Sequence, residues 1–213
     1  MNETKKNTMP KWLLVCLLAG GAILIVAGLL TVFGGNSASQ SFVDRFNELQ
    51  ASNVGINSDL TSASNLLLGI EAKEMEKDYT GIISDLQITL ANLNDAEAKV
   101  VLTSTTLTKL QDMIDDSSDQ NVKTTGVQFI DALNTRNDAA LKMISDAKDL
   151  VNQAATYYNE VANNQQVTID VDEFAAAANA FYVNSQNLAG IGEQYNAAAN
   201  AFAEAAGFVI EDQ

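Results

Sequence analysis

The sequence contains no histidine, and only one proline and one cysteine occur among its 213 residues. Histidine is the usual general base of enzymes and a common zinc ligand, so its absence excludes Ser-His-Asp and Cys-His mechanisms. The phosphate-binding patterns GxxxxGK[ST] and GxGxxG are also absent. We therefore expect a protein that is not an enzyme, with no catalytic, cofactor-binding or metal-binding residues.

Charged residues are missing from the run "WLLVCLLAGGAILIVAGLLTVF" at positions 12–33. A helix of this length reaches about 33 Å, enough to cross a hydrocarbon core of about 30 Å. The run predicts a transmembrane helix, and a cleaved signal peptide is the alternative, although its apolar region is usually shorter. The residues expected to anchor the chain are Trp12, Leu13, Leu14, Leu24, Ile25 and Phe33.

Three lysines, Lys5, Lys6 and Lys11, precede the apolar run, with Glu3 as the only acidic residue on that side. The positive-inside tendency then keeps residues 1–11 in the cytoplasm. We expect 34–40 to be a linker and 41–210 to lie outside the cytoplasmic membrane. The only cysteine, Cys16, falls within the anchor, so the exported part must be stabilised by packing without a disulfide.

Acidic residues outnumber basic ones by 27 to 12, which gives a net charge of −15. Such a surface repels phosphate backbones, so we expect no nucleic-acid partner. Weak calcium binding at the acidic connectors stays open, although neither "DDSSDQN" nor the segment 162–173 has the glycine that an EF-hand loop requires.

Apolar residues recur at alternating spacings of four and three through most of positions 42–209, which is typical of helices that pack along a narrow seam. Three polar segments interrupt the pattern, at 71–78, 115–121 and 163–174. The pattern predicts helices at about 41–77, 79–115, 122–164 and 172–208. Similar lengths and short connectors favour an all-α, elongated, antiparallel four-helix bundle that resembles a coiled coil. One continuous helix over the first two ranges is the alternative.

Two polar features fall within the predicted helices. Asn53 and Asn184 occupy seam positions, where a buried amide either fixes the register or is accommodated at a wet seam. The stretch "NTRND" at 134–138 is polar enough to predict a weak point in the third helix. The last connector alternates like a short strand at 167–171, and Asp170 with Glu173 fits a capping box that begins the last helix.

The last helix contains the related phrases "FAAAANAF" at 174–181 and "YNAAANAF" at 195–202. They are 21 residues apart, which is three heptads, so both lie on one face of the helix. Small alanines allow a neighbouring helix to approach closely while the aromatic rings fill the wider gaps. The predicted packing face is Phe174, Ala177, Phe181, Leu188, Ile191, Tyr195, Ala198 and Phe202.

In layout, the chain resembles the LemA family of bacterial proteins, which have a short cytoplasmic N-terminus, one anchor and a long exported helical domain. The segment "EQYNAAANAF" at 193–202 is similar to the tyrosine- and asparagine-rich last helix of that family. The sequence predicts an interaction or assembly module of the cell envelope with a protein partner, and a homo-oligomer is possible. The alternative is a ligand-sensing subunit that signals through a partner membrane protein.

Overall fold

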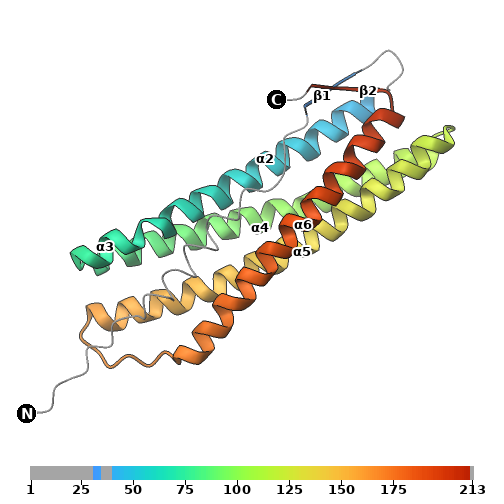
Figure 1. Ribbon diagram of the computed structural model, residues 1–213. Coiled ribbons are helices and arrows are strands. Elements are labelled where there is room, and N and C mark those ends of the chain that lie inside the picture. Colours follow the sequence, from blue (N-terminus) through green and yellow to red (C-terminus); the bar gives the residue numbers. More distant parts are fainter. Residues whose placement is uncertain (1–30, 35–39, 212–213) are drawn as a thin grey trace, which may run out of the picture.

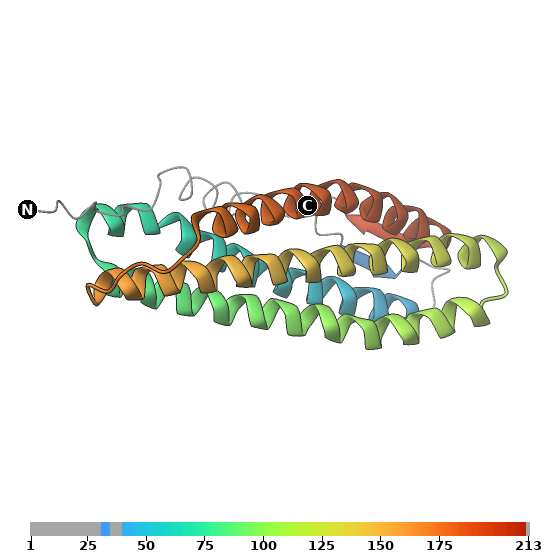
Figure 2. The ribbon, with the colours of Figure 1, turned by 90° about the horizontal axis from the view of Figure 1, so that it is seen from below.

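The computed structural model describes residues 31–34 and 40–211, and the fold over these ranges is a bundle of long helices (Figure 1). Its elements in chain order are β1 (Thr31–Gly34), α2 (Gln40–Leu68), α3 (Ile70–Glu76), α4 (Tyr79–Asp116), α5 (Gln120–Ala162), α6 (Val171–Ala205) and β2 (Phe208–Glu211). The predicted bundle of four long helical segments is confirmed, and a pair of short strands, β1 and β2, is added to it. α4 packs against both α2 and α5, and α6 packs on α5; Figure 2 shows α5 running between α6 and α4.

Aspartate caps begin three of the helices. Asp78 accepts a hydrogen bond from the backbone N–H of Gly81, and Asp119 accepts one from Asn121. Asp170 accepts from the N–H groups of residues 172 and 173, so the predicted start of the last helix has its cap. Each cap satisfies backbone donors that the helix itself leaves unpaired, and is typically worth about 1 kcal/mol.

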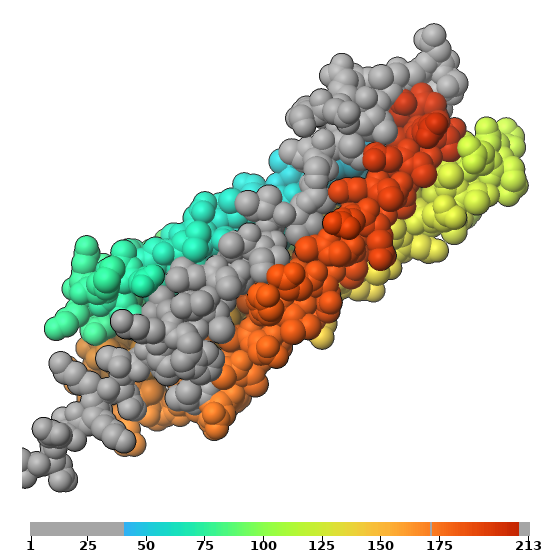
Figure 3. All heavy atoms as spheres, viewed as in Figure 1, coloured from blue at the N-terminus to red at the C-terminus, as the bar shows by residue number. Residues whose placement is uncertain are grey.

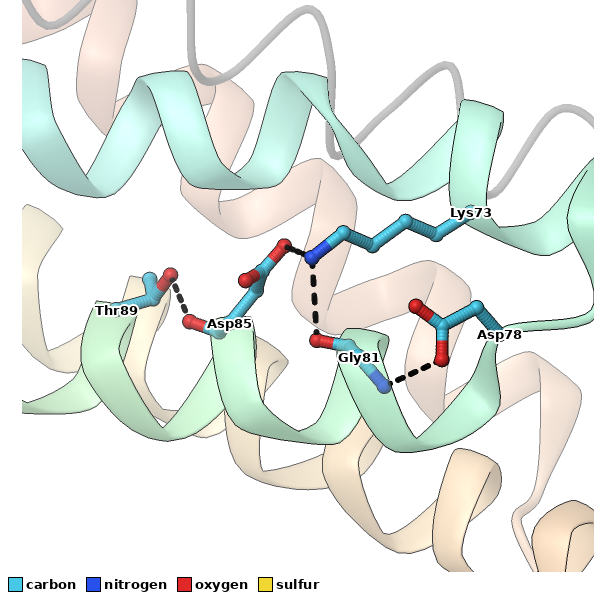
Figure 4. A network of polar contacts seen from close by, with 5 residues as sticks. All are labelled: Lys73, Asp78, Gly81, Asp85 and Thr89. Atoms are coloured by element: carbon cyan, nitrogen blue, oxygen red, sulfur yellow. Dashed lines mark hydrogen bonds and ion pairs between the residues drawn. The ribbon is translucent and has the colours of Figure 1, made fainter.

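The first two predicted helices are separated by a sharp turn that is fixed by polar contacts (Figure 4). Lys77 has φ of 59°, a left-handed conformation that ends α3. Lys73 Nζ then lies 2.6 Å from Asp85 Oδ2 and donates to the carbonyl of Gly81, which joins α3 to the first turns of α4. Thr89 is buried and donates to the carbonyl of Asp85, so its hydroxyl is satisfied within α4.

The chain departs from the predicted helices at both ends of the described part. α6 ends at Ala205 because Gly207 takes a positive φ of 73°, and residues 208–211 then pair antiparallel with residues 31–34. Positions 31–33 were expected to end a transmembrane helix but belong to this strand, whose β-branched Thr31 and Val32 suit an extended chain. Neither of the two strands could be predicted, because the local sequence at 31–34 and at 208–211 also continues the apolar pattern of a helix.

Most of the predicted anchor, positions 12–30, and the three topology lysines lie outside the described residues. Within residues 40–211, no helix combines the length and the apolar character that crossing a bilayer requires. The predicted short strand at 167–171 does not form: the connector 163–170 has no strand partner, although Val167 and Ile169 both pack on the core.

The interior of the bundle contains two separate apolar clusters. The first lies toward the α3–α4 turn and includes Ile70, Ile82 and Tyr158. The second lies at the opposite end and is rich in aromatic rings, with Phe129 stacked on Phe202 at a centroid distance of 5.4 Å. Between the clusters the core is polar, and that level of the bundle is the candidate site.

Candidate functional site

Every long helix places a polar group in the level between the two apolar clusters. We call this set the polar layer, and it consists of Gln50, Asn53, Thr103, Arg136, Asn137 and Tyr195. All six residues are buried; Arg136 and Asn53 are each only 5% exposed. Buried polar groups are costly unless they are paired, so their partners decide what the layer can do.

Most groups of the polar layer bind one another across the bundle. Arg136 Nη1 donates to Asn53 Oδ1 at 2.8 Å, and Asn53 Nδ2 donates to the Tyr195 hydroxyl at 3.2 Å. Gln50 Nε2 donates to the same hydroxyl at 3.4 Å, while Asn137 Nδ2 donates to Thr103 Oγ1 at 2.8 Å. These bonds join α2 to α5 and α6, and α4 to α5.

Arg136 has no ionised partner among the described residues. The four ion pairs of this part of the chain use Arg45, Lys73, Lys99 and Lys148 instead. The Arg136 guanidinium lies 5.0 Å from the centre of the Tyr195 ring, a cation–π contact. Burial raises the pKa of the Tyr195 hydroxyl, so the phenol stays neutral and supplies no negative charge.

Burial also lowers the pKa of the Arg136 guanidinium, because the charged form has lost its hydration. An arginine nevertheless stays protonated in proteins, so a full positive charge lies inside the bundle. Arg136 Nε is buried and has no hydrogen-bond partner. On α6, the Oδ1 atom of Asn196 is also buried and unpartnered. These two are the buried side-chain atoms of the described residues that lack a partner.

A second feature is a groove on the outside of the bundle between α5 and α6. It contains two hollows of about 560 and 570 Å³, the first lined by Lys142, Asn187 and Gln194 among others. Asn184 donates to Asp146 across the groove, so this predicted seam residue joins α6 to α5 at its edge. The two hollows follow one another along the same helix pair.

The predicted packing face of α6 divides into two groups in the structure. Five of its members are buried, namely Phe174, Phe181, Leu188, Tyr195 and Phe202. The other three, Ala177, Ile191 and Ala198, are half-buried. The small residues that are buried lie one position later, at Ala178, Ser185, Gly192 and Ala199. The aromatic residues and Leu188 thus lie in the core as predicted. The small residues that let α6 approach its neighbours closely are each one position later than expected.

Sequence reasoning identified Asn53 but missed Arg136 and Asn137. Both lie in the stretch 134–138, which was expected to weaken the third helix; α5 instead runs through it without a break. The available signal was that positions 133, 136, 137 and 140 continue the seam of this helix. A charged residue at a seam position was therefore a sign of a buried polar group, although the sequence does not show that Asn53 is its partner.

The described residues contain no cluster of three or more His, Cys, Asp or Glu side chains that could hold a metal ion. No protein-family model, curated protein or solved structure matches this chain.

Proposed function

We propose that this protein is a non-enzymatic, single-pass membrane-anchored module whose helical bundle lies outside the cytoplasmic membrane and assembles with a second copy of the chain. The observation that carries the proposal is the outer face of α6. Between Phe174 and Ala203 this helix has one charged residue, Glu193, although the whole chain has a net charge of −15. Because the rest of the surface is acidic, the repulsion between two copies of the chain is weakest when these nearly uncharged faces are in contact.

The outer face of α6 also has a heptad pattern of its own. Its residues are spaced four and three apart, every one is exposed, and none is charged: Ala176, Ala180, Val183, Asn187, Gly190, Gln194, Ala197 and Ala201. At 1.5 Å per residue the row is about 38 Å long. Figure 3 shows α6, in orange and red, on the surface of the bundle. Small residues along such a row allow a second helix to approach to about 8 Å.

The row is self-complementary when two copies run antiparallel. A two-fold axis between positions 188 and 189 brings Ala180 opposite Ala197 of the other copy, and Asn187 opposite Gly190. An isologous contact of this kind closes a dimer without leaving a free surface for further growth. An anchor on each chain would hold both copies at the same membrane and raise their effective concentration.

Disulfide trapping in the full-length, detergent-solubilised chain tests this arrangement. With Cys16 replaced by serine, we expect a mixture of Ala180→Cys and Ala197→Cys chains to form a mixed disulfide dimer on mild oxidation. The matched control is a mixture of Ala91→Cys and Thr108→Cys chains, because these exposed positions of α4 have the same separation. Equal trapping in both mixtures, or none in the first, would contradict the proposed dimer.

Topology needs a separate measurement. A cysteine introduced at Asp115, at the exposed end of α4, should react with a membrane-impermeant maleimide in whole cells. Labelling that requires lysed cells would refute the extracytoplasmic location and leave the dimer test unaffected.

A ligand-sensing role is the second candidate function, and it is favoured by a different observation. The polar layer holds a buried arginine that no carboxylate of the described residues neutralises. A sensing bundle of this kind would transmit its signal through a partner membrane protein.

A further inference from the structure

Within the part of the chain that the structure describes, the Arg136 guanidinium has an unusual free edge. Within the described residues its one hydrogen bond is the Nη1 contact to Asn53, so the edge formed by Nε and Nη2 donates to no protein atom. This edge carries two parallel N–H groups. Its geometry matches the two oxygens of a carboxylate, which an arginine binds bidentately.

The rest of the polar layer adds donors to this edge. The Tyr195 hydroxyl accepts hydrogen bonds from Gln50 and Asn53, and within the described residues it donates none, so its own proton is available. The acceptor atoms of Asn53 and Thr103 are already used by Arg136 and Asn137. The layer therefore places two kinds of unused donor, the Nε–Nη2 edge of Arg136 and the Tyr195 hydroxyl, next to a positive charge, and an anionic acceptor would satisfy both.

We propose that the polar layer is a binding site for the carboxylate of a small organic anion, with the Nε–Nη2 edge of Arg136 as its main contact. Asn53 holds the guanidinium in place through Nη1, and Tyr195 covers one face of it. A monocarboxylate balances the single buried charge. A dianion such as sulfate would leave an excess negative charge in a chain whose net charge is already −15.

This inference deepens the ligand-sensing candidate and is independent of the outer face of α6. The buried polar chain of Asn53 and Tyr195 connects Arg136 to α2 and α6, so an anion at Arg136 touches groups held by three helices. Binding is expected to stabilise the bundle, because a ligand that binds the folded state alone shifts unfolding toward higher temperature.

The test is a titration of the full-length chain in a non-ionic detergent, observed by NMR of the arginine Nε–H groups. The chain has two arginines, so Arg45, which is half-exposed and paired with Glu48, serves as an internal control. The probes are the monocarboxylates sodium acetate and sodium benzoate, each compared with sodium chloride at equal ionic strength. We expect at least one carboxylate to shift the Arg136 resonance saturably while the Arg45 resonance stays in place.

Variants separate binding from folding. Arg136→Met should weaken the carboxylate-dependent rise in unfolding temperature at least about tenfold in apparent affinity, because a charge-assisted bidentate contact is lost. Arg45→Met should keep the full response. If no probe moves the Arg136 resonance, or if Arg136→Met responds as the wild type does, the proposed site is refuted. The NMR titration decides the question on the wild-type chain even if Arg136→Met fails to fold, and neither measurement depends on dimerisation through α6.

Discussion

Replacing Gly126 with alanine should destabilise the bundle, although alanine is the better helix former. Gly126 is buried in α5 opposite Ile114 of α4. A Cβ added at Gly126 would lie 2.8 Å from Cγ1, Cγ2 and Cδ1 of Ile114. These are closer than real Cβ contacts, and Ile114 is itself 0% exposed, so the two helices must separate or the isoleucine must leave its rotamer.

The magnitude follows from two opposing terms. Overpacking a filled core costs about 1–3 kcal/mol, and three simultaneous close contacts place this case in the upper half of that range. Replacing glycine by alanine within a helix returns about 1 kcal/mol. We expect a net loss of about 1–2 kcal/mol, which for a chain of this size lowers the unfolding temperature by about 3–6 °C.

The matched control is Gly69→Ala at the junction of α2 and α3. Gly69 has helical dihedral angles, with φ of −76° and ψ of −14°, and an added Cβ would come no closer than 3.4 Å to any atom. This variant should be stabilised by about 0.4–1 kcal/mol. Circular-dichroism melts and urea titrations of both variants supply the comparison.

A double variant identifies the contact that is responsible. Ile114→Val removes Cδ1, one of the three close atoms, and should cost about 0.5–1.5 kcal/mol alone but less when Gly126 is already alanine. If Gly126→Ala were as stabilising as Gly69→Ala, or if the effects of the two core substitutions were additive, the close packing of α4 on α5 at this level would be wrong.

Two further outcomes test other parts of the molecule. Phe202→Ala should lower the free energy of unfolding in urea by about 3–5 kcal/mol, because the ring is fully buried against Phe129 and Phe208. The control, Leu102→Ala at an exposed position of α4, should change that free energy by no more than about 0.5 kcal/mol. Glu160 accepts hydrogen bonds from the Thr168 N–H and hydroxyl, which lowers the pKa of its carboxyl below the ordinary value of 4.5. These hydrogen bonds stabilise the connector at pH values above the pKa of Glu160 in the unfolded chain, and their contribution is lost as the pH falls through the lower pKa of the folded chain. A carbon-detected NMR titration should find the lowered pKa of Glu160. Thr168→Val removes the hydroxyl donor and should raise that pKa again.

The helices could be predicted from the sequence because their signals are local. The heptad spacing and the capping aspartates Asp119 and Asp170 each lie within a few residues of the element they define. The second strand had no such signal. Val209 continues the seven-residue spacing of the last helix, so the sequence pattern favours a longer helix there, and the pairing of Phe208 with Gly34 joins residues more than 170 positions apart in sequence.

Two details of the bundle interior, one in the packing of α6 and one in the polar layer, could not be predicted from the local sequence pattern. In "FAAAANAF", Ala177 and Ala178 have the same hydropathy, so only the packing of α6 against its neighbours selects Ala178 for the core. Arg136 has a charge, and charged residues are rarely fully buried. Its burial depends on Asn53, a partner 83 residues away that only the assembled bundle brings near.

The polar layer also explains how helices with such regular seams find one alignment. A heptad pattern alone permits neighbouring helices to slide by seven residues, because each apolar position meets another apolar position. In this bundle, sliding α2 by one heptad would replace Asn53 with Phe46 or Leu60 opposite Arg136. The guanidinium would then lose its hydrogen bond to Asn53, at a cost of about 1.5–3 kcal/mol, and Asn53 would enter an apolar cluster. The same shift of α6 would place Leu188 or Phe202 where the Tyr195 hydroxyl accepts its two bonds. We infer that the layer fixes the register of α2, α5 and α6, while the unused edge of Arg136 leaves the same residues able to receive an anion.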